Sequence, residues 1–493
     1  MNTQIRNLFL VTVLLFGLLI AFTSRWTVFG DESLRDNALN RRDLIRSERV
    51  PRGRILAADG SVLARSVQQR SRDTNVKSYK RRYPKGQAYV APVGFSDTTL
   101  GQLSGLERSQ NDWLAGKAVK LATAVDKLIK GDQRGDDVRT TLEPSVQQAA
   151  INGLAGRAGS VVALDPSTGK VLAMVSVPSW DPNKARTSPD YFSKLNQLSR
   201  THPLTNRATQ DAYVPGSTFK VVTAAAALDS GKYTPDTIID GSNAQSFSGH
   251  VLNNSGGESY PSAPLRTQLT HSVNTAFANV ASDLGKATMD RYMKRFGFGD
   301  LPPLDYPADQ MRPSGEFLAG KKRGRFIPAT SRFVDVARLG IGQDKLQVTP
   351  LQMAMVAATV ANGGRLMKPH LVDRVVDADG RVQKTVDPQL YRRVMSSGAA
   401  SDLRSMMGDV VNEGTGTAAA LSGGVQVGGK TGTAELNIAK GLNDLWFIGF
   451  APLSSPKVAV AVVVENTQGF GGPVAGPIAK QVMQAALQSG AGR

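Results

Sequence analysis

The sequence of 493 residues contains no cysteine and only four histidines. Without cysteine there can be no disulfide bond, no thiolate metal site and no cysteine nucleophile. The histidines are His202, His250, His271 and His370, and no two of them have the spacing of metal ligands. This composition argues against a zinc enzyme, and we expect neither a metal nor another cofactor.

Acidic residues are scarce relative to basic ones, with 41 Asp and Glu against 59 Lys and Arg. The formal net charge of +18 implies an anionic neighbour: nucleic acid, an anionic lipid surface or an acidic polymer such as cell wall. The chain lacks a nucleic-acid-binding motif, zinc-knuckle spacing and an arginine-rich tail. Nucleic acid is therefore the least favoured of the three, and we expect no nucleic-acid partner.

Near the N-terminus an apolar run extends from Leu8 to Phe22, with Arg6 before it and Arg25-Trp26 after it. The run reaches the lower limit of a membrane span, about 17–25 residues, only when the next two residues are included. No Ala-x-Ala cleavage site follows it, so we favour an uncleaved anchor over residues 8–24 rather than a signal peptide. We expect a single-pass protein of the cell membrane, with residues 1–7 in the cytoplasm and the rest outside.

From residue 25 to residue 85 the chain is basic. Such a stretch is either a solvated linker or a juxtamembrane segment close to anionic lipid head groups or wall polymer. Within it, Asp59-Gly60 separates two apolar runs and predicts a β-hairpin. Helical periodicity extends from Asn111 to Lys130. We place a domain boundary after residue 137, so that 25–137 form a smaller N-terminal domain and 138–493 the main one.

The main domain shows strands, then helices, then strands again. Residues 160–175 form two β-rich runs around a Pro-Ser-Thr-Gly turn, which predicts a hairpin. A helical pattern covers Pro350–Ala361, strand patterns return at 445–450 and 458–464, and a final helix is expected from about Pro477 to Leu487. This order predicts an α+β fold with one mainly antiparallel sheet.

Ser217 follows Pro215-Gly216 and precedes an alanine-rich run that predicts a helix ending at Gly231. At a helix N-terminus, backbone N–H groups and the helix dipole favour developing negative charge. Lys220 stands three residues later on the same face, where a neutral lysine would supply the base that a serine nucleophile needs. Burial or another cation must lower the lysine pKa for this. Taken alone, the pair is more typical of an N-cap serine with a surface lysine.

A second motif, Ser272-Val-Asn274, lies in a polar stretch before a helical run that begins at Thr275. A hydroxyl there can relay protons to a leaving group, and the amide of Asn274 can hold a substrate carbonyl. The triplet alone is a frequent chance match. His271 beside Ser272 suggests a serine–histidine pair, but no Gly-x-Ser-x-Gly elbow surrounds either serine, so a structural histidine is the better interpretation.

A third motif, Lys430-Thr-Gly-Thr433, precedes the apolar strands near the C-terminus. Alternate residues of a strand share a face, so Lys430 and Gly432 would point one way and Thr431 and Thr433 the other. Gly432 would let a substrate lie close against the strand edge. A lysine and hydroxyls on that strand suit a substrate carboxylate.

In order, S-x-x-K, S-x-N and K-T-G form the signature of serine β-lactamases and penicillin-binding proteins. The sequence resembles, over nearly its whole length, the class B penicillin-binding proteins, monofunctional D,D-transpeptidases that cross-link peptidoglycan. The stretches similar to that family are Arg52-Gly-Arg-Ile and Asp59-Gly60 in the pedestal, and Asp165–Gly169, Glu413–Thr417 and Trp446–Phe450 in the transpeptidase domain. The single span and compact pedestal look most like the actinobacterial penicillin-binding protein A group.

The resemblance implies that residues 25–137 form a pedestal or dimerisation-like domain and 138–493 a penicillin-binding transpeptidase domain. It implies a donor stem peptide ending in D-alanyl-D-alanine, which Ser217 attacks with Lys220 as base. The further roles carried over are proton transfer by Ser272 and Lys430, substrate binding by Asn274, Thr431, Gly432 and Thr433, and an oxyanion hole from the N–H groups of Ser217 and Thr433.

The resemblance also implies partners. These are peptidoglycan stem peptides and lipid-linked precursors, β-lactam antibiotics, a SEDS-type glycan polymerase, and proteins of the division or elongation machinery. Other functions stay open. A β-lactamase shares the motifs but needs a deacylating base, and the two glutamates between the second and third motifs, Glu316 and Glu413, lack the required context. A D,D-carboxypeptidase differs only in its acceptor. A β-lactam sensor or a non-catalytic wall scaffold is the alternative from another class.

Overall fold

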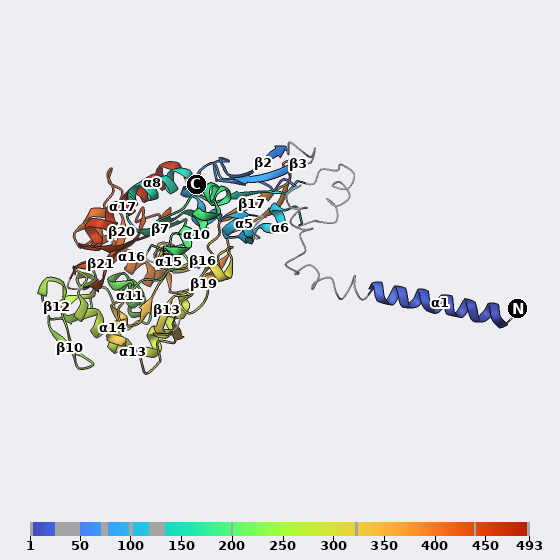
Figure 1. Cartoon of the computed structure of the whole chain (residues 1–493). Helices are drawn as coiled ribbons and strands as arrows, with labels where there is room; N and C mark the ends of the chain where they lie inside the picture. Colours follow the sequence, from blue (N-terminus) through green and yellow to red (C-terminus); the bar gives the residue numbers. More distant parts are fainter. Residues whose placement is uncertain are drawn as a thin grey trace.

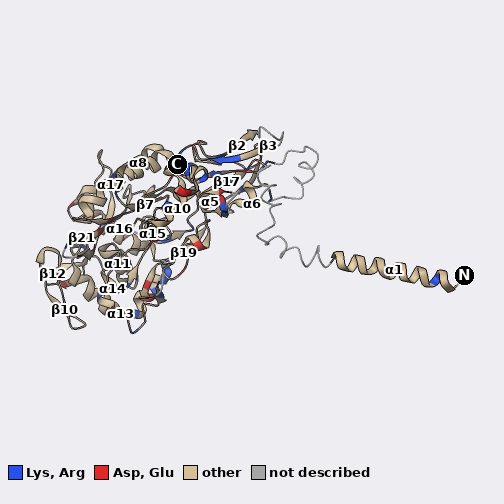
Figure 2. Cartoon of the chain, viewed as in Figure 1, with Lys and Arg blue, Asp and Glu red and all other residues tan. Residues whose placement is uncertain are grey.

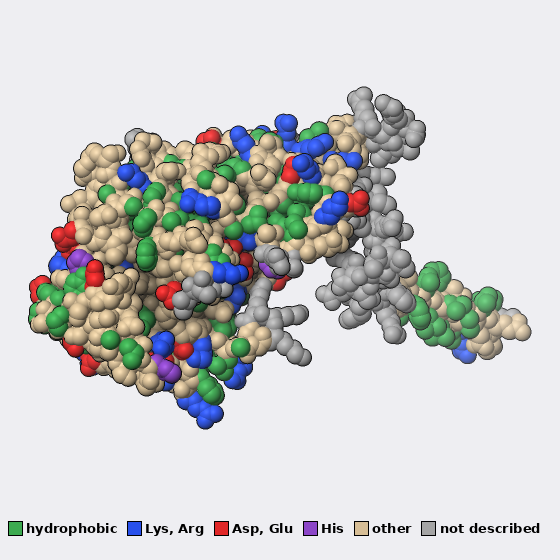
Figure 3. Space-filling view, turned by 60° about the vertical axis from the view of Figure 1, so that its left-hand side comes forward, with side chains coloured by type: hydrophobic (Ala, Val, Ile, Leu, Met, Phe, Trp, Pro, Cys, Tyr) green, Lys and Arg blue, Asp and Glu red, His purple; other side chains and the backbone are tan. Residues whose placement is uncertain are grey.

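The computed structural model describes residues 3–24, 50–70, 77–97, 102–117, 134–198, 201–320, 324–437 and 440–490. Helix α1 (Thr3–Ser24) stands apart from the folded body (Figure 1). Hydrophobic side chains cover it in the space-filling view of Figure 3. Its segment Thr3–Thr23 has a mean hydropathy of 2.3 and none of it is buried, so α1 is long and apolar enough to cross a membrane. The expected anchor over 8–24 is part of this longer helix, which already includes Arg6.

A six-stranded sheet with the order β18-β17-β6-β1-β2-β3 takes β1, β2 and β3 from the expected N-terminal domain. The strands are β18 (Val382–Thr385), β17 (Val372–Val376), β6 (Asp137–Thr140), β1 (Ile55–Leu56), β2 (Val62–Arg70) and β3 (Lys77–Arg82). β1 and β2 pair antiparallel around Asp59-Gly60, which confirms the predicted hairpin. β6 crosses the expected domain boundary, and β17 and β18 come from far along the chain, so this sheet ties the two domains together.

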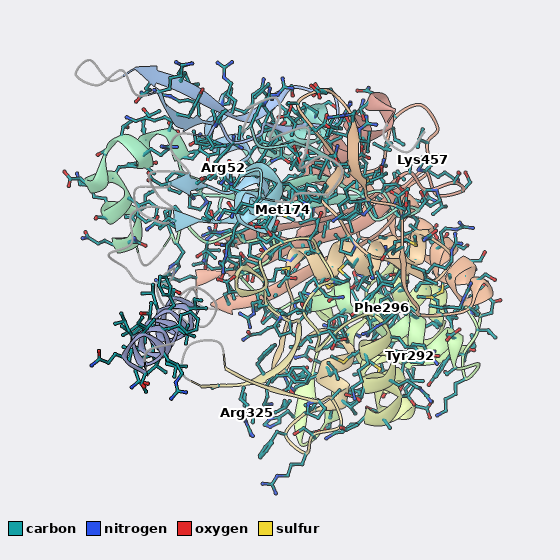
Figure 4. All side chains as sticks on the ribbon, turned by 90° about the vertical axis from the view of Figure 1, so that its right-hand side faces the viewer. Arg52, Met174, Tyr292, Phe296, Arg325 and Lys457 are labelled. Carbon is teal, nitrogen blue, oxygen red and sulfur yellow. The ribbon has the colours of Figure 1, made fainter. Side chains whose placement is uncertain are left out.

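A buried ion network lies beside this sheet. The carboxylate of Glu107 is fully buried and binds Arg81 Nε at 2.5 Å and Arg52 Nη2 at 3.0 Å. Two guanidinium groups therefore compensate one carboxylate that water does not reach. Figure 4 shows Arg52 in the upper part of the view. Tyr292 and Phe296 lie in the lower, helical part, and Met174 lies between the two parts.

The helix predicted for Asn111–Lys130 begins at Asn111 as expected, but its predicted continuation beyond Leu114 is wrong. Helix α6 covers only Asn111–Leu114, the next three residues are not helical, and residues 118–133 lie outside the described residues. Gly116 has a φ of +68°, which turns the chain out of the helix. The other short elements of this region are α4 (Val90–Val93), α5 (Gly105–Ser109), β4 (Ser96–Asp97) and β5 (Gln102–Leu103).

The main domain is built on a five-stranded sheet with the order β20-β21-β22-β7-β8, and every pair is antiparallel. Its strands are β20 (Gly428–Asn437), β21 (Leu442–Ala451), β22 (Val458–Thr467), β7 (Gly159–Leu164) and β8 (Val171–Val177). The hairpin predicted for 160–175 and both C-terminal strands are confirmed. The predicted α+β class with a mainly antiparallel sheet is confirmed as well.

Both faces of this sheet are buried. Along β22, Ala459, Ala461 and Val463 pack into one core cluster, and the alternate residues from Val458 to Val464 pack into the other. Helices α8 (Pro144–Leu154) and α17 (Gly471–Ser489) cover the second face, and α15 (Pro350–Ala361) covers the first. The helix predicted at 350–361 is confirmed.

Helix α17 begins at Gly471, more than one turn before the expected start at Pro477. Gly471 lies against the carbonyl oxygens of Gly432 and Trp446, where a Cβ atom would collide with the backbone. The sequence pattern missed this start because the helix begins with glycines. Glycine has a low helix propensity, but it allows the close packing on β20.

The remaining helices lie with α11 (Lys220–Asp229) in the main domain. They are α12 (Leu265–Thr270), α13 (Asn274–Arg295), α14 (Val336–Gly340) and α16 (Ser397–Asn412), with α9 (Pro182–Thr187) and α10 (Pro189–Gln197) nearer the N-terminal domain. Helix α11 packs against α13 and α16, and Figure 1 shows α11, α13, α14 and α16 in one part of the folded body. Small strands complete the fold: β9 (Ile238–Gly241), β10 (Gln245–Phe247), β11 (His250–Leu252), β12 (Tyr260–Pro264), β13 (Gly315–Leu318), β14 (Arg325–Ile327), β15 (Leu346–Gln347), β16 (Arg365–Met367) and β19 (Leu390–Arg393).

Candidate active site

Ser217 lies in a 3₁₀ turn, η3 (Gly216–Phe219), that leads directly into α11. Gly216 has a φ of +52°, and a Cβ atom on it would be 2.7 Å from the carbonyl oxygen of Thr433. Its N–H donates to the carbonyl oxygen of Gly342 at 3.0 Å. Glycine adopts this conformation without strain in so little space. The turn therefore holds the partly exposed Ser217 beside β20.

Lys220, the first residue of α11, is fully buried. Its Nζ donates to the carbonyl oxygen of Ser272 at 2.6 Å and to Asn274 Oδ1 at 2.8 Å, and it lies 3.3 Å from Ser272 Oγ. Burial lowers the pKa of Lys220 well below its ordinary value, and the charge of Lys430 lowers it further. Lys220 makes no hydrogen bond to Ser217 in the described structure; such contacts often tighten only when substrate binds.

Ser272 stands between two lysines. Its Oγ accepts a hydrogen bond from Lys430 Nζ at 2.8 Å and lies 3.3 Å from Lys220 Nζ. Its φ of +59° is left-handed, which costs a non-glycine residue about 1–3 kcal/mol. Lys430 is fully buried, and burial lowers its pKa to about 7. One hydroxyl thus bridges two amines with depressed pKa values, an arrangement that can pass a proton between them.

Strand β20 lies at the edge of the five-stranded sheet and carries the third motif. Lys430 points to Ser272, and Gly432 faces the nucleophile turn, where a Cβ atom would lie 2.7 Å from the carbonyl oxygen of Pro215. The sequence suggested that Gly432 admits substrate to the strand edge. In the structure, the missing side chain admits the turn that carries Ser217.

The two threonines of this motif face the other way. Thr431 Oγ1 lies 2.7 Å from Thr415 Oγ1, and Thr433 Oγ1 accepts a hydrogen bond from the Gly471 N–H at 3.2 Å. The side chains therefore alternate as predicted. Thr431 is buried and already has a protein partner, whereas Thr433 is partly exposed. The structure brings together in one place the eight residues named from the sequence: Ser217, Lys220, Ser272, Asn274, Lys430, Thr431, Gly432 and Thr433.

The other candidates from the sequence lie outside this cluster. His271 is exposed, and its ring stacks on Tyr260 with centroids 5.2 Å apart. Glu316 is buried in β13, and burial raises its pKa to about 8. Glu413 follows the C-terminus of α16. Within the part of the chain that the structure describes, none of the three hydrogen-bonds a residue of the motifs.

Sequence reasoning missed the residues that hold the second motif in place. The carbonyl oxygen of Asn253 accepts a hydrogen bond from Asn274 Nδ2 at 3.0 Å. Asn254 is buried, and its Oδ1 accepts from the N–H and the hydroxyl of Thr275, both at 3.0 Å. The Asn-Asn pair lies between the short strand β11 and a polar Ser-Gly-Gly turn, a pattern that gives no signal of contact with α13.

A second missed group supports the nucleophile turn. Tyr213 Oη donates to Glu465 Oε1 at 2.5 Å, and Arg207 Nε binds the same oxygen at 2.7 Å. Trp446 Nε1 donates to the carbonyl oxygen of Val214 at 3.1 Å. These bonds tie the segment before Ser217 to β21 and β22. They join residues far apart in the sequence, so no local pattern reveals them.

Comparison with known families decides what kind of protein this is. A profile described as the penicillin-binding protein transpeptidase domain matches residues 159–484, which is more than half of the chain. The chain belongs to the penicillin-binding protein transpeptidase family. A profile described as the penicillin-binding protein A dimerisation domain matches residues 52–138 of this penicillin-binding protein. The resemblance seen in the sequence is confirmed.

Individual relatives agree with the family. Peptidoglycan D,D-transpeptidase PbpA of Mycolicibacterium smegmatis is 37% identical, over 99% of this chain and 100% of the relative. Peptidoglycan D,D-transpeptidase MrdA of Escherichia coli K12 is 31% identical, over 84% of this chain and 72% of the relative. The penicillin G acyl-enzyme structure of penicillin-binding protein A from M. tuberculosis superimposes with a TM-score of 0.78 at 34% identity, covering 89% of this chain and all of that chain.

Proposed function

We propose that this penicillin-binding protein is a peptidoglycan D,D-transpeptidase that cross-links stem peptides through an acyl-enzyme on Ser217. The observation that carries the proposal is the convergence of Lys220 and Lys430 on Ser272 beside the turn of Ser217. Relatives named peptidoglycan D,D-transpeptidases and the acyl-enzyme structure of a similar protein support it.

In the acylation step, Ser217 attacks the penultimate carbonyl of a stem peptide ending in D-alanyl-D-alanine. The Oγ–C bond forms while the hydroxyl proton passes to neutral Lys220, a state favoured by the depressed pKa of that lysine. The N–H groups of Ser217 and Thr433 would hold the oxyanion, a role worth about 10²–10³ in rate per donor. As the C–N bond breaks, Ser272 relays a proton to the amine of the departing D-alanine.

In the second step, an amine from a neighbouring stem peptide attacks the ester carbonyl. The new amide bond forms, the ester bond to Ser217 breaks, and the amine proton returns to Ser217 Oγ through Lys220. A β-lactam presents the same kind of carbonyl in a ring, so its amine stays attached after acylation and the ester persists.

Substrate binding is assigned to Asn274 and to β20. Asn274 is held between Lys220 and the carbonyl oxygen of Asn253, so its amide is fixed beside the nucleophile turn. Lys430 and Thr433 of β20 supply a charge and a partly exposed hydroxyl for a carboxylate. Because the Thr431 hydroxyl binds Thr415 and its carbonyl oxygen accepts from Lys430 Nζ at 3.1 Å, its contribution is to position β20 and Lys430.

The apolar helix α1 supports an uncleaved anchor, with residues 1–7 in the cytoplasm and the catalytic domain outside the cell membrane. The basic hairpin β2–β3 lies on the side of the body toward α1 (Figure 2), where anionic lipid or wall polymer would meet it. We assign 25–137 to the pedestal and 138–493 to the transpeptidase domain. A SEDS-type polymerase and division or elongation proteins are the proposed partners.

Labelling with fluorescent penicillin tests the proposal on the full-length protein in detergent. We expect labelling that persists for hours in the wild type and disappears in Ser217→Ala. Ser230→Ala is the matched control, because Ser230 lies at the other end of α11 and its hydroxyl donates to the carbonyl oxygen of Ala227 in the same helix. Its labelling should equal that of the wild type.

The other outcomes identify the alternatives. A label lost within seconds would indicate a β-lactamase-like hydrolase. Folded wild-type protein that takes up no label would contradict the catalytic assignment and leave a wall scaffold. Persistent labelling together with release of D-alanine but no cross-linked product would indicate a D,D-carboxypeptidase.

A further inference from the structure

A hollow of about 420 Å³ lies outside the cluster of motifs. The turn of the β10–β11 hairpin, helix α13 and the segment before α14 form its walls. The side chains that matter for its chemistry are Phe247, Ser248, Ser282, Lys286, Arg332 and Phe333. Its volume is within the range of about 300–1,000 Å³ that is usual for small-molecule sites.

The hollow combines positive charge with aromatic surface. Arg332 lies over the exposed ring of Phe333, with 4.8 Å from Cζ to the ring centroid. Lys286 Nζ donates to the carbonyl oxygen of Ser331 at 2.9 Å. In the described ranges, neither cation forms a salt bridge with a carboxylate, so both can pair with an anion from outside. The one acidic residue in the lining, Asp335, is occupied as the N-cap of α14.

The walls of the hollow lead to the catalytic cluster. The β10–β11 hairpin ends beside Asn253, whose carbonyl oxygen holds Asn274. Helix α13 begins with Asn274 itself, about 12 Å before Ser282 at 1.5 Å per residue, and it is kinked at Gly285 (φ +74°), just before Lys286. Helix α14 leads to Gly342, whose carbonyl oxygen accepts the Gly216 N–H beside the nucleophile. A ligand that holds these walls together would fix the positions of Asn274 in the second motif and of the turn that carries Ser217 in the first.

The place of the hollow narrows the choice of ligand. Figure 1 shows β10, α13 and α14 at the end of the folded body far from β2, β3 and α1. The described chain enters the folded body at residue 50, next to β1 and β2, so we infer that the opposite end of the body faces the wall. An anion that reaches the hollow from this side comes from the cell wall. Peptidoglycan carries carboxylates on its peptides, next to sugar rings that can stack on phenylalanine.

We propose that this hollow binds a carboxylate-bearing glycan–peptide segment of peptidoglycan as a second site, and that occupancy favours the geometry that acylates. This inference rests on the proposed transpeptidase function. Lys286 and Arg332 pair with the carboxylates, and Phe247 and Phe333 pack against sugar rings. Because the ligand holds the hairpin turn against α13, it biases Asn274 toward the position seen here.

Binding can be measured with the catalytic site blocked. Full-length protein is first acylated with penicillin and then titrated with a fluorescent disaccharide–tetrapeptide, which lacks the terminal D-alanine that acylation removes. We expect saturable binding that weakens at least tenfold in Lys286→Gln/Arg332→Gln. Arg291→Gln, on the exposed side of α13, is the matched control and should bind as the wild type does.

Coupling is measured as the rate of penicillin acylation with and without the same fragment. We expect the fragment to accelerate the wild type severalfold and to leave the double variant at its basal rate, which should equal that of the wild type. No binding to the acylated protein, unchanged affinity in the double variant, or equal affinity for a fragment with amidated carboxylates would each overturn the proposal. Loss of penicillin acylation in the wild type would instead be a failure of the proposed function.

Discussion

Removal of the charge of Lys430 is expected to move the pH dependence of acylation to higher pH. Acylation needs Lys220 without its proton, so the rate rises as pH passes upward through the pKa of Lys220. Burial and the charge of Lys430 hold that pKa down. Lys430, with a pKa of about 7, carries its charge at pH values below neutral. Lys430→Gln removes the charge and therefore raises the pKa of Lys220.

The size of the shift follows from the geometry. The two amines lie 3.3 and 2.8 Å from the same oxygen, Ser272 Oγ. They are therefore at most about 6 Å apart, which gives a repulsion of roughly 3 kcal/mol at an effective dielectric constant of about 20. That energy corresponds to about 2 pKa units. Partial titration of the coupled pair reduces the effect, so we expect the acidic limb to move by about 1–2 pH units.

The assay is the first-order acylation rate constant at saturating β-lactam, followed by stopped flow across pH. At saturating β-lactam the rate constant does not depend on affinity. A change in the pKa of Lys220 can therefore be distinguished from weaker binding of the β-lactam carboxylate. Lys457→Gln, in the connection between β21 and β22, is the control and should keep the wild-type limb. A limb that stays in place in Lys430→Gln would refute the idea that Lys430 sets the protonation of Lys220.

Three further substitutions test other parts of the structure. Ser272→Ala removes the hydroxyl between the lysines and should slow acylation by about 10²–10⁴, measured by penicillin labelling; an unchanged rate would exclude a proton relay there. Gly216→Ala places a methyl group against β20 at a positive φ and should cost about 1–3 kcal/mol with slower acylation, measured by denaturation and labelling; wild-type values would contradict the tight fit. Glu107→Gln leaves two buried arginines without their carboxylate and should destabilise by about 3–5 kcal/mol in urea. Burial raises the pKa of Glu107, but the two arginines outweigh it and hold the pKa below 4.5. Wild-type stability should therefore fall as pH drops below about 4.5, a fall that Glu107→Gln should lack.

Much of the main domain could be predicted from the sequence because its elements are locally coded. The hairpin at 160–175 has a strong turn between β-branched runs, and α15 has an uninterrupted apolar pattern. The three motifs are short and contiguous, so their residues could be named without knowing the fold. The residue types of the first two motifs also indicated a lysine that must be neutral next to a hydroxyl.

The rest depends on contacts between distant parts of the chain. Strands β17 and β18 join the N-terminal sheet from more than 200 residues away, and no change in composition along the chain predicts this pairing. The start of α17 is set by close packing of Gly471 on β20. Helix propensity does not reflect this packing, so the predicted start lies too late in the sequence. The support of the nucleophile turn by Tyr213 and Glu465 is likewise visible only in three dimensions.

Product analysis with uncross-linked glycan strands that carry pentapeptide stems measures transpeptidation by Ser217 itself. The full-length protein is incubated with these strands, the glycan is digested with a muramidase, and the fragments are identified by mass spectrometry. We expect cross-linked dimers and one released D-alanine per link in the wild type, and neither product in Ser217→Ala. Cross-linked dimers formed by Ser217→Ala, or none formed by wild-type protein that penicillin acylates, would contradict the assignment of transpeptidation to Ser217.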